Sequence, residues 1–162
     1  MDERTKKVLD TLHPEVRGKF ETFLIEAQAL AETRGLEYKA ICGTRTWEEQ
    51  ARLYAQGRPG PDGIKVPGPI VTNARPGFSF HNFGLAIDCG VFRGGKYLDE
   101  AEPKTANAFH KQAGALAKEH GLRWGGDFKT IVDTPHFELD TSLSLSQLRD
   151  RKKVSPWVSL TV

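Results

Sequence analysis

Two short segments of this chain each carry a histidine and an aspartate. His81 and Asp88 belong to the first, and Asp133 and His136 belong to the second. Two imidazoles and one carboxylate, from His81, Asp88 and His136, suit a tetrahedral zinc ion whose fourth position is open to water. A closed structural zinc site normally uses four protein ligands, often cysteines, and the two cysteines of this chain form no CxxC pair. The residue types therefore predict a zinc site that can do chemistry.

Hydrolysis at such a site needs a base as well as a metal. Zinc lowers the pKa of its bound water to about 7, so hydroxide is available at neutral pH. Asp133 is close in sequence to His136 and need not be a ligand, so it is our candidate for the base that moves a proton onto the leaving amine. Arg45 could bind a developing oxyanion or a substrate carboxylate. By itself, an arginine at the start of a helix is more typical of a surface residue.

Strand alternation explains how the two segments could form one site. Alternate residues of a β-strand share a face. The residues that share a face with Asp88 are among the smallest available: Gly84, Ala86 and Gly90. The opposite face is apolar and predicts burial: Leu85, Ile87, Cys89 and Val91. If the strand that begins at His136 pairs with this one, Asp88 and His136 lie side by side, and the small residues leave room for a metal and a substrate.

Hydrophobic spacing and helix-capping patterns predict the elements that position these residues. Helices are expected at residues 14–35, 46–56, 103–120 and 145–152, and strands at 36–42, 84–92 and 136–139. Thr46 and Glu49 form a capping-box pattern. Residues 57–80 are rich in glycine and proline and predict a long loop that leads into His81. The mixture predicts an α+β fold, a small antiparallel sheet with helices packed on one side.

The remaining histidines and the cysteines are expected to be structural. His13 precedes Pro14 at a helix entrance, whereas His110 and His120 are expected on the surface of a helix. The two cysteines are expected to be buried free thiols, although their spacing alone leaves a disulfide open. The tail around Trp157 is expected to be loosely ordered.

Composition excludes several classes of protein. The net charge of +2 and the lack of a basic face with interleaved aromatics argue against nucleic acid. No apolar run approaches the roughly 20 residues that span a bilayer. The charged N-terminus, with no apolar segment after it, predicts that a secretory signal peptide is absent. We therefore expect synthesis in the cytoplasm and no membrane insertion.

The two segments resemble a known family. Ser79, His81, Gly84, Ala86 and Asp88, followed by Asp133 and His136, resemble the LAS metallopeptidases, which include D-alanyl-D-alanine peptidases, the hedgehog zinc domain and phage endolysins. Residues 79–88 and 124–128 are most similar to the L-alanyl-D-glutamate endopeptidase branch of phage endolysins. The resemblance covers residues 12–139, and either motif alone would be less specific.

This resemblance implies a peptidoglycan endopeptidase with a hedgehog-like or DD-peptidase-like fold. It implies zinc ligands at His81, Asp88 and His136, and a catalytic base at Asp133. It also implies substrate or transition-state contacts by Arg45 and substrate-binding positions for Gln50 nearby and for Ser79, which would also support the ligands. We expect a monomer with a catalytic domain at residues 1–140 and a short helix and tail at 141–162 that form no separate domain. The expected activity is cleavage of the L-Ala-D-Glu bond of the stem peptide, as in endolysin-driven cell-wall lysis. The protein would then act on the cell wall after release from the cytoplasm through a holin or a specialised export route. A peptidase that opens the wall for a secretion apparatus fits equally.

Three alternatives stay open at the level of sequence. A D-alanyl-D-alanine carboxypeptidase would have the same zinc site and differ only in its substrate pocket. A non-haem iron oxygenase also uses two histidines and a carboxylate, but it generally has more strands than this helix-rich chain predicts. A non-catalytic zinc-binding interaction domain would have no need of Asp133 or Arg45.

Overall fold

The computed structural model describes residues 1–152 and 157–160, and this part of the chain has an α+β fold. Its α-helices are α1 (Glu3–Asp10), α2 (Pro14–Glu32), α3 (Trp47–Ala55), α4 (Leu98–Ala101), α5 (Pro103–Glu119) and α6 (Leu145–Lys152). Two short 3-10 helices are η1 (Phe80–Phe83) and η2 (Gly125–Asp127). The strands are β1 (Glu37–Cys42), β2 (Ala86–Arg93), β3 (Lys96–Tyr97), β4 (Leu122–Trp124) and β5 (His136–Leu139).

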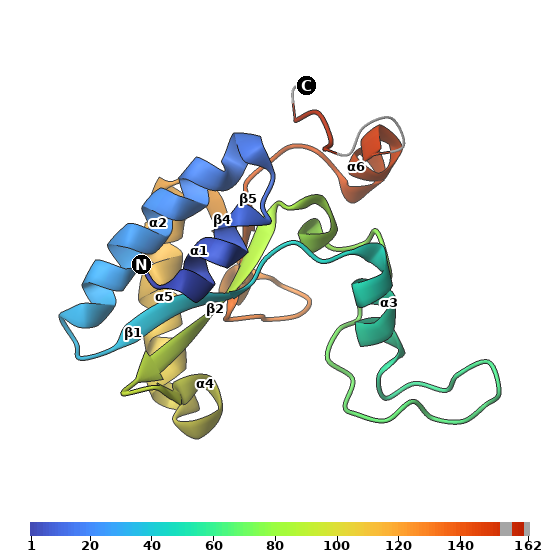
Figure 1. Ribbon diagram of the computed structural model, residues 1–162, viewed down its shortest axis with the longest axis horizontal. Coiled ribbons are helices and arrows are strands. Elements are labelled where there is room, and N and C mark those ends of the chain that lie inside the picture. The colour runs from blue at the N-terminus through green and yellow to red at the C-terminus, as the bar shows by residue number, and fades with distance from the viewer. Residues whose placement is uncertain (153–156, 161–162) are drawn as a thin grey trace.

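The strands form one antiparallel sheet in the order β1–β2–β5–β4, with β3 paired to the end of β2 (Figure 1). β2 lies between β1 and β5, and Asp88 is the register partner of Cys42 in β1 and of His136 in β5. The side-by-side placement of Asp88 and His136 that strand alternation predicted is thus confirmed. The register shifts between Ala40 and Cys42, at the point where the chain leaves β1 toward Arg45.

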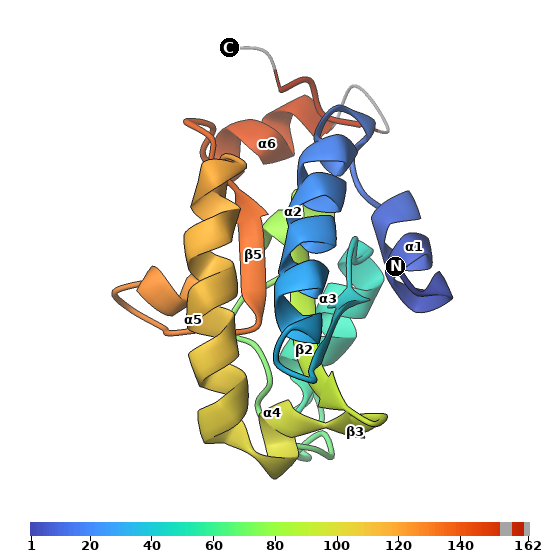
Figure 2. The same cartoon turned by 90° about the vertical axis from the view of Figure 1, so that its left-hand side faces the viewer.

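Helices α2 and α5 pack against one face of the sheet, as Figure 2 shows from that side. The apolar face of β2 meets them, because Ile87, Cys89 and Val91 are fully buried. Phe23 of α2 stacks on Phe137 of β5 with ring centroids 4.9 Å apart. Helix α3 and the loop after it project on the other side of the sheet (Figure 1). The predicted α+β fold is therefore confirmed, and the second face is left free for a site.

The two arms of the long loop after α3 are hydrogen-bonded to each other. The predicted capping box of α3 is present, with Thr46 and Glu49 each bonding the other's backbone N–H. Arg58 donates to the carbonyl of Thr72 at 2.9 Å and to Oδ1 of Asn73 at 2.8 Å. These bonds hold the glycine- and proline-rich segment in one path between α3 and η1.

Several short elements were not predicted. They are α1, the β2–β3 hairpin, α4 and β4. α1 is only eight residues long and buries only Thr5 and Leu9, so few apolar residues mark it in the sequence. The hairpin turn is Gly94-Gly95, with φ values of 55° and 79°. Two consecutive glycines between strands are the usual cue for such a turn, and this cue could have revealed the hairpin.

One expectation about a single residue was wrong. His110 is fully buried, not on the surface, and its ring bonds the hydroxyl of Tyr38 at 3.0 Å and Oδ1 of Asp99 at 2.6 Å. Trp157 lies in the tail that was expected to be loosely ordered, and its ring packs edge-on against His13 with centroids 5.2 Å apart. Part of the tail, residues 153–156 and 161–162, lies outside the described residues.

The segment after β5 packs on the same hydrophobic core as the rest of the chain. Leu143, Leu148 and Val158 are buried within that core. The carbonyl of Val158 lies 2.7 Å from Nε2 of His13 and accepts a hydrogen bond from it. Among the helices that the structure describes, none combines the length and apolar character needed to cross a membrane.

Candidate active site

Three donor atoms converge where β2 meets β5. Oδ1 of Asp88 lies 3.1 Å from Nε2 of His81 and 3.1 Å from Nδ1 of His136, and the two ring nitrogens are 3.2 Å apart. His81 comes from η1, which ends at Gly84 in the left-handed conformation (φ 71°) and so turns the chain directly into β2. The structure therefore brings the three residues predicted to bind zinc to one point.

The outer nitrogen of each imidazole is held by an oxygen acceptor. Nδ1 of His81 lies 2.7 Å from the carbonyl of Gly43, and Nε2 of His136 lies 3.0 Å from Oε2 of Glu138. A carbonyl or carboxylate oxygen can only accept, so these two nitrogens donate. Histidines that bind metals usually have this arrangement, because the outer bond fixes the tautomer and the ring orientation. Glu138 was not predicted as part of the site, although it shares a strand face with His136.

The donor set fits a zinc ion. A tetrahedral site with zinc–nitrogen and zinc–oxygen bonds of about 2.0–2.1 Å places its ligand atoms about 3.4 Å apart. The three observed separations of 3.1–3.2 Å are close to that value. A sulfur is also near, since Sγ of Cys42 lies within 4.8 Å of donor atoms of His81 and Asp88. That sulfur instead accepts a hydrogen bond from Nε of Arg45 at 3.2 Å.

Charge is strongly coupled within the triad. Burial opposes a charge on either imidazole, but the Asp88 carboxylate outweighs it and raises the pKa of His81. Hydrogen bonds to Asp88 and Glu138 likewise raise the pKa of His136 to about 9. Burial works against the Asp88 charge, yet the two imidazoles hold the pKa of Asp88 well below its usual range. The metal-free site thus favours an ionised Asp88 that shares a proton with the imidazoles.

Arg45 belongs to this cluster and is not a free surface residue. Its Nη2 lies 2.5 Å from Oδ2 of Asp88, on the side of the carboxylate away from the imidazoles. Only 19% of its side chain is exposed. The guanidinium is therefore close enough to the triad to meet a substrate group bound there.

The triad opens into a cleft of about 330 Å³. Its lining residues come from β1, the β1–α3 connection, the long loop, η1, β2, β3, the β4–β5 connection and the start of β5: Ile41, Arg45, Val71, Thr72, Ala74, Ser79, His81, Asp88, Tyr97, Asp133, Pro135 and His136. Asp133 lies at the rim of the cleft, and burial of its carboxyl, together with the nearby Asp88 charge, raises the pKa of Asp133. A cleft with a metal-ligand triad, an arginine and a carboxyl of raised pKa has the groups that a hydrolase needs.

Ser79 and Gln50 occupy different positions. Ser79 lines the cleft, and its Oγ accepts a hydrogen bond from the N–H of His81 at 3.3 Å, which caps η1. Gln50 is fully buried and does not line the cleft; it donates to the carbonyl of Ala74 at 2.8 Å. Its Oε1 has no hydrogen-bond partner among the residues that the structure describes. Gln50 therefore supports the loop that lines the cleft and does not itself face it.

Sequence reasoning missed Tyr97, which lines the cleft from the β2–β3 hairpin. Its ring packs against Phe92, and a Cβ added to Gly90 would lie 2.7 Å from it. The small residue at position 90 therefore makes room for an aromatic ring as well as for a substrate. Burial and the nearby acidic residues Asp99 and Glu100 raise the pKa of Tyr97 to about 12, so its phenol is neutral at physiological pH.

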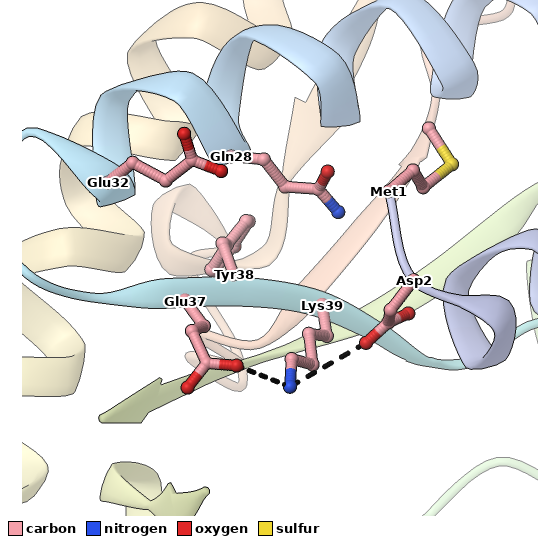
Figure 3. Close-up of a pocket in the computed structure, with 7 residues that line it drawn as sticks. All are labelled: Met1, Asp2, Gln28, Glu32, Glu37, Tyr38 and Lys39. Atoms are coloured by element: carbon pink, nitrogen blue, oxygen red, sulfur yellow. Dashed lines mark ion pairs between the residues drawn. The ribbon is translucent and has the colours of Figure 1, made fainter. Parts of the chain in front are cut away.

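A second pocket lies between α2 and β1, away from the triad (Figure 3). Three of its charged side chains are paired with one another, since Lys39 lies 2.6 Å from Glu37 and 3.6 Å from Asp2. None of the predicted site residues is among those that line it. The chemistry therefore belongs to the cleft.

Comparison with known proteins identifies the family. A family model described as D-alanyl-D-alanine carboxypeptidase matches residues 72–139, which include the triad and Asp133. The peptidoglycan L-alanyl-D-glutamate endopeptidase CwlK of Bacillus subtilis (strain 168) is 34% identical over 132 residues, 79% of this chain and 73% of that protein. The chain belongs to the LAS-type metallopeptidase family. The resemblance predicted from its two motifs is thus confirmed.

Solved structures share the fold of this metallopeptidase. The L-Ala D-Glu endopeptidase ChiX of Serratia marcescens superposes with a TM-score of 0.51 at 18% identity, covering 86% of this chain and 88% of ChiX. The D,D-pentapeptidase VanY of a VanB-type resistance cassette, solved with Zn(II), has a TM-score of 0.53 at 15% identity, covering 86% and 78%. Both likenesses concern the fold alone. The two proteins have different activities by name, one an L-Ala D-Glu endopeptidase and the other a D,D-pentapeptidase.

Proposed function

We propose that this metallopeptidase hydrolyses the L-alanyl-D-glutamate bond of the peptidoglycan stem peptide, with zinc held by His81, Asp88 and His136. The convergence of their three donor atoms, at 3.1–3.2 Å from one another, carries the proposal. The choice of bond is supported by the 34% identity to CwlK over most of both chains.

The residues around the triad have separate parts in this proposal. When bound, zinc would supply Lewis-acid chemistry, lowering the pKa of water and polarising the scissile carbonyl. Arg45, beside Asp88, would bind the oxyanion or a substrate carboxylate through its guanidinium. Asp133, at the rim of the cleft, would take a proton from the attacking water and deliver it to the leaving amine. Ser79 would hold the backbone of His81, and Gln50 would hold the loop.

Digestion of purified peptidoglycan, followed by mass spectrometry, tests the proposal. We expect stem peptides with a new N-terminal D-glutamate, and we expect a chelator to abolish them and added zinc to restore them. If folded, zinc-loaded protein yields no product from peptidoglycan, the chain is a zinc-binding interaction domain and the proposal fails.

One other activity has support of its own. The matching family model is described as a D-alanyl-D-alanine carboxypeptidase, and VanY, which shares the fold, is a D,D-pentapeptidase. The same zinc site would serve that reaction, because only the substrate pocket differs. Release of free D-alanine without new N-terminal D-glutamate would support the carboxypeptidase and overturn the endopeptidase.

The proposed role is lysis of a bacterial cell wall, as by an endolysin. Its support is the choice of substrate, since cutting stem peptides opens the cross-linked wall. Adding the protein to bacteria with permeabilised outer layers should lower the turbidity of the suspension. An Asp133→Ala variant at the same concentration should leave the turbidity unchanged.

A further inference from the structure

Arg45 lies in the connection between β1 and α3, yet its peptide is firmly held. Its N–H donates to the carbonyl of His81 at 3.0 Å. Its carbonyl accepts a hydrogen bond from Nδ2 of Asn82 at 3.1 Å. Two consecutive residues of η1 thus bond the backbone N–H and the backbone carbonyl of Arg45. The segment that carries one metal ligand also sets the position of the guanidinium beside Asp88.

Asn82 joins this arginine to the loop that lines the cleft. Only 1% of Asn82 is exposed. Its Oδ1 accepts a hydrogen bond from the N–H of Gly77 at 3.0 Å, while its Nδ2 donates to the carbonyl of Arg45. Oδ1 is an acceptor and Nδ2 a donor, so the amide fits the two partners in one orientation only. No other uncharged side chain of this size carries a separate carbonyl acceptor and N–H donor, so this pair of bonds requires asparagine.

Side chains of helix α6 bond the backbone at Asn82 and at Gly77. Nζ of Lys152 donates to the carbonyl of Asn82 at 3.3 Å. Nη1 of Arg149 donates to the carbonyl of Gly77 at 3.1 Å, and the guanidinium lies 4.0 Å from the ring centroid of Phe78. The backbone around Asn82 is therefore fixed independently of its side-chain amide, so loss of the amide alone leaves the local fold supported.

We infer that Asn82 is a positioning residue that couples the Arg45 guanidinium and the cleft-lining loop to the metal-ligand segment. This inference rests on the proposed function, because Arg45 matters only if it meets a substrate. Asn82 acts through Arg45 and has no contact with the reacting atoms. Displacement of a catalytic group by about 1 Å can lower the rate roughly 100-fold, so the loss of the Nδ2 bond is expected to lower kcat/KM by 10- to 100-fold.

A double-mutant cycle tests the coupling. Asn82→Ala, Arg45→Ala and the double variant are compared by kcat/KM on stem peptides, with products counted by mass spectrometry. If Asn82 acts through Arg45, the double variant is no worse than Arg45→Ala beyond about two-fold. If the two losses multiply, Asn82 has a structural role only and the inference is overturned. All four proteins are assayed at saturating zinc, so that the comparison reports kcat/KM of the zinc-loaded forms.

Asn82→Asp separates the two hydrogen bonds and covers the case in which the alanine variant fails to fold. The carboxylate can still accept from the Gly77 N–H but cannot donate to the Arg45 carbonyl. We expect slow amide hydrogen exchange at Gly77, as in the wild type, together with the loss in kcat/KM. Full activity in Asn82→Asp would overturn the inference.

Asn73→Ala is the matched control. Asn73 is an exposed asparagine of the same loop whose Oδ1 accepts from Arg58. Any fold-loss in kcat/KM that Asn73→Ala causes should multiply with the fold-loss of Arg45→Ala when the two are combined. An inactive wild-type protein would count against the proposed function, whereas an active wild type with multiplying losses at positions 45 and 82 would count only against the role of Asn82.

Discussion

Asp88 and His136 are directly opposed residues of β2 and β5, and Oδ1 of the aspartate lies 3.1 Å from Nδ1 of the histidine. Backbone hydrogen bonds between the strands therefore set the spacing of two of the three donor atoms. The third, His81, is fixed from η1 by its bond to the Gly43 carbonyl. A site built this way is held by the sheet and by η1.

Asp133→Ala should retain zinc and lose activity. The carboxyl lies at the rim of the cleft and is not one of the three converging donors, so the metal site should be intact. General-base catalysis contributes about 10²–10⁴-fold, and we expect kcat to fall by that amount. Zinc content by elemental analysis and peptidoglycan digestion check the two parts separately.

A matched control is Asp127→Ala, which removes an exposed aspartate paired with Lys118 at 2.7 Å. Its activity should stay close to that of the wild type. If Asp133→Ala instead loses its zinc, Asp133 is a ligand and its role as base is wrong.

Glu138→Gln should weaken zinc binding without removing a ligand. Oε2 of Glu138 accepts from Nε2 of His136, and Oε1 accepts from Arg123 at 2.6 Å. Loss of such an outer partner typically lowers metal affinity about 10–100-fold. Competition with a chromophoric chelator measures the change, and Glu102→Gln, which removes a partly exposed partner of Arg93, is the control. Equal zinc affinity in both variants would show that Glu138 does not orient His136.

Zinc binding should release about one proton at neutral pH. In the metal-free protein the pKa of His136 is raised to about 9, so this ring is protonated near pH 7.5. Nδ1 of His136 lies 3.2 Å from Nε2 of His81, and this distance leaves room for one proton between the two nitrogens. Zinc must displace that proton, so affinity should rise with pH by roughly ten-fold per unit below the raised pKa.

Titration calorimetry in buffers of different ionisation enthalpy counts the released protons. The sign follows from the raised pKa, because protons compete with the metal at low pH and are absent above about pH 9. An affinity that stays constant between about pH 6.5 and 8.5 would contradict this assignment.

His110→Phe should destabilise the fold without changing the zinc site. His110 is fully buried and bonds the Tyr38 hydroxyl and the Asp99 carboxylate, both of which would lose a partner. Unsatisfied buried groups of this kind cost about 2–4 kcal/mol in total. Denaturant unfolding measures the loss, and His120→Gln, which removes a partly exposed partner of Glu26, should change the free energy of unfolding by less than about 1 kcal/mol.

The sequence by itself determined which residues could come together as candidate metal ligands and most of the elements that carry them. Strand alternation is a local property, so the opposition of Asp88 and His136 could be predicted, and it matches the observed register. The capping box at Thr46 and the long loop were also local and were predicted. Short elements such as α1 and the β2–β3 hairpin have too few buried positions to produce a clear pattern.

Only the tertiary structure decided which polar residues belong together. His110 lies on a helix whose sequence fits a surface position, but α5 packs that face against Tyr38 of β1, 72 residues away. Asn82 and Glu138 are ordinary polar residues until η1 and β5 place them against Arg45 and His136. Their roles depend on hydrogen bonds between segments distant in the chain, and local periodicity carries no information about such contacts.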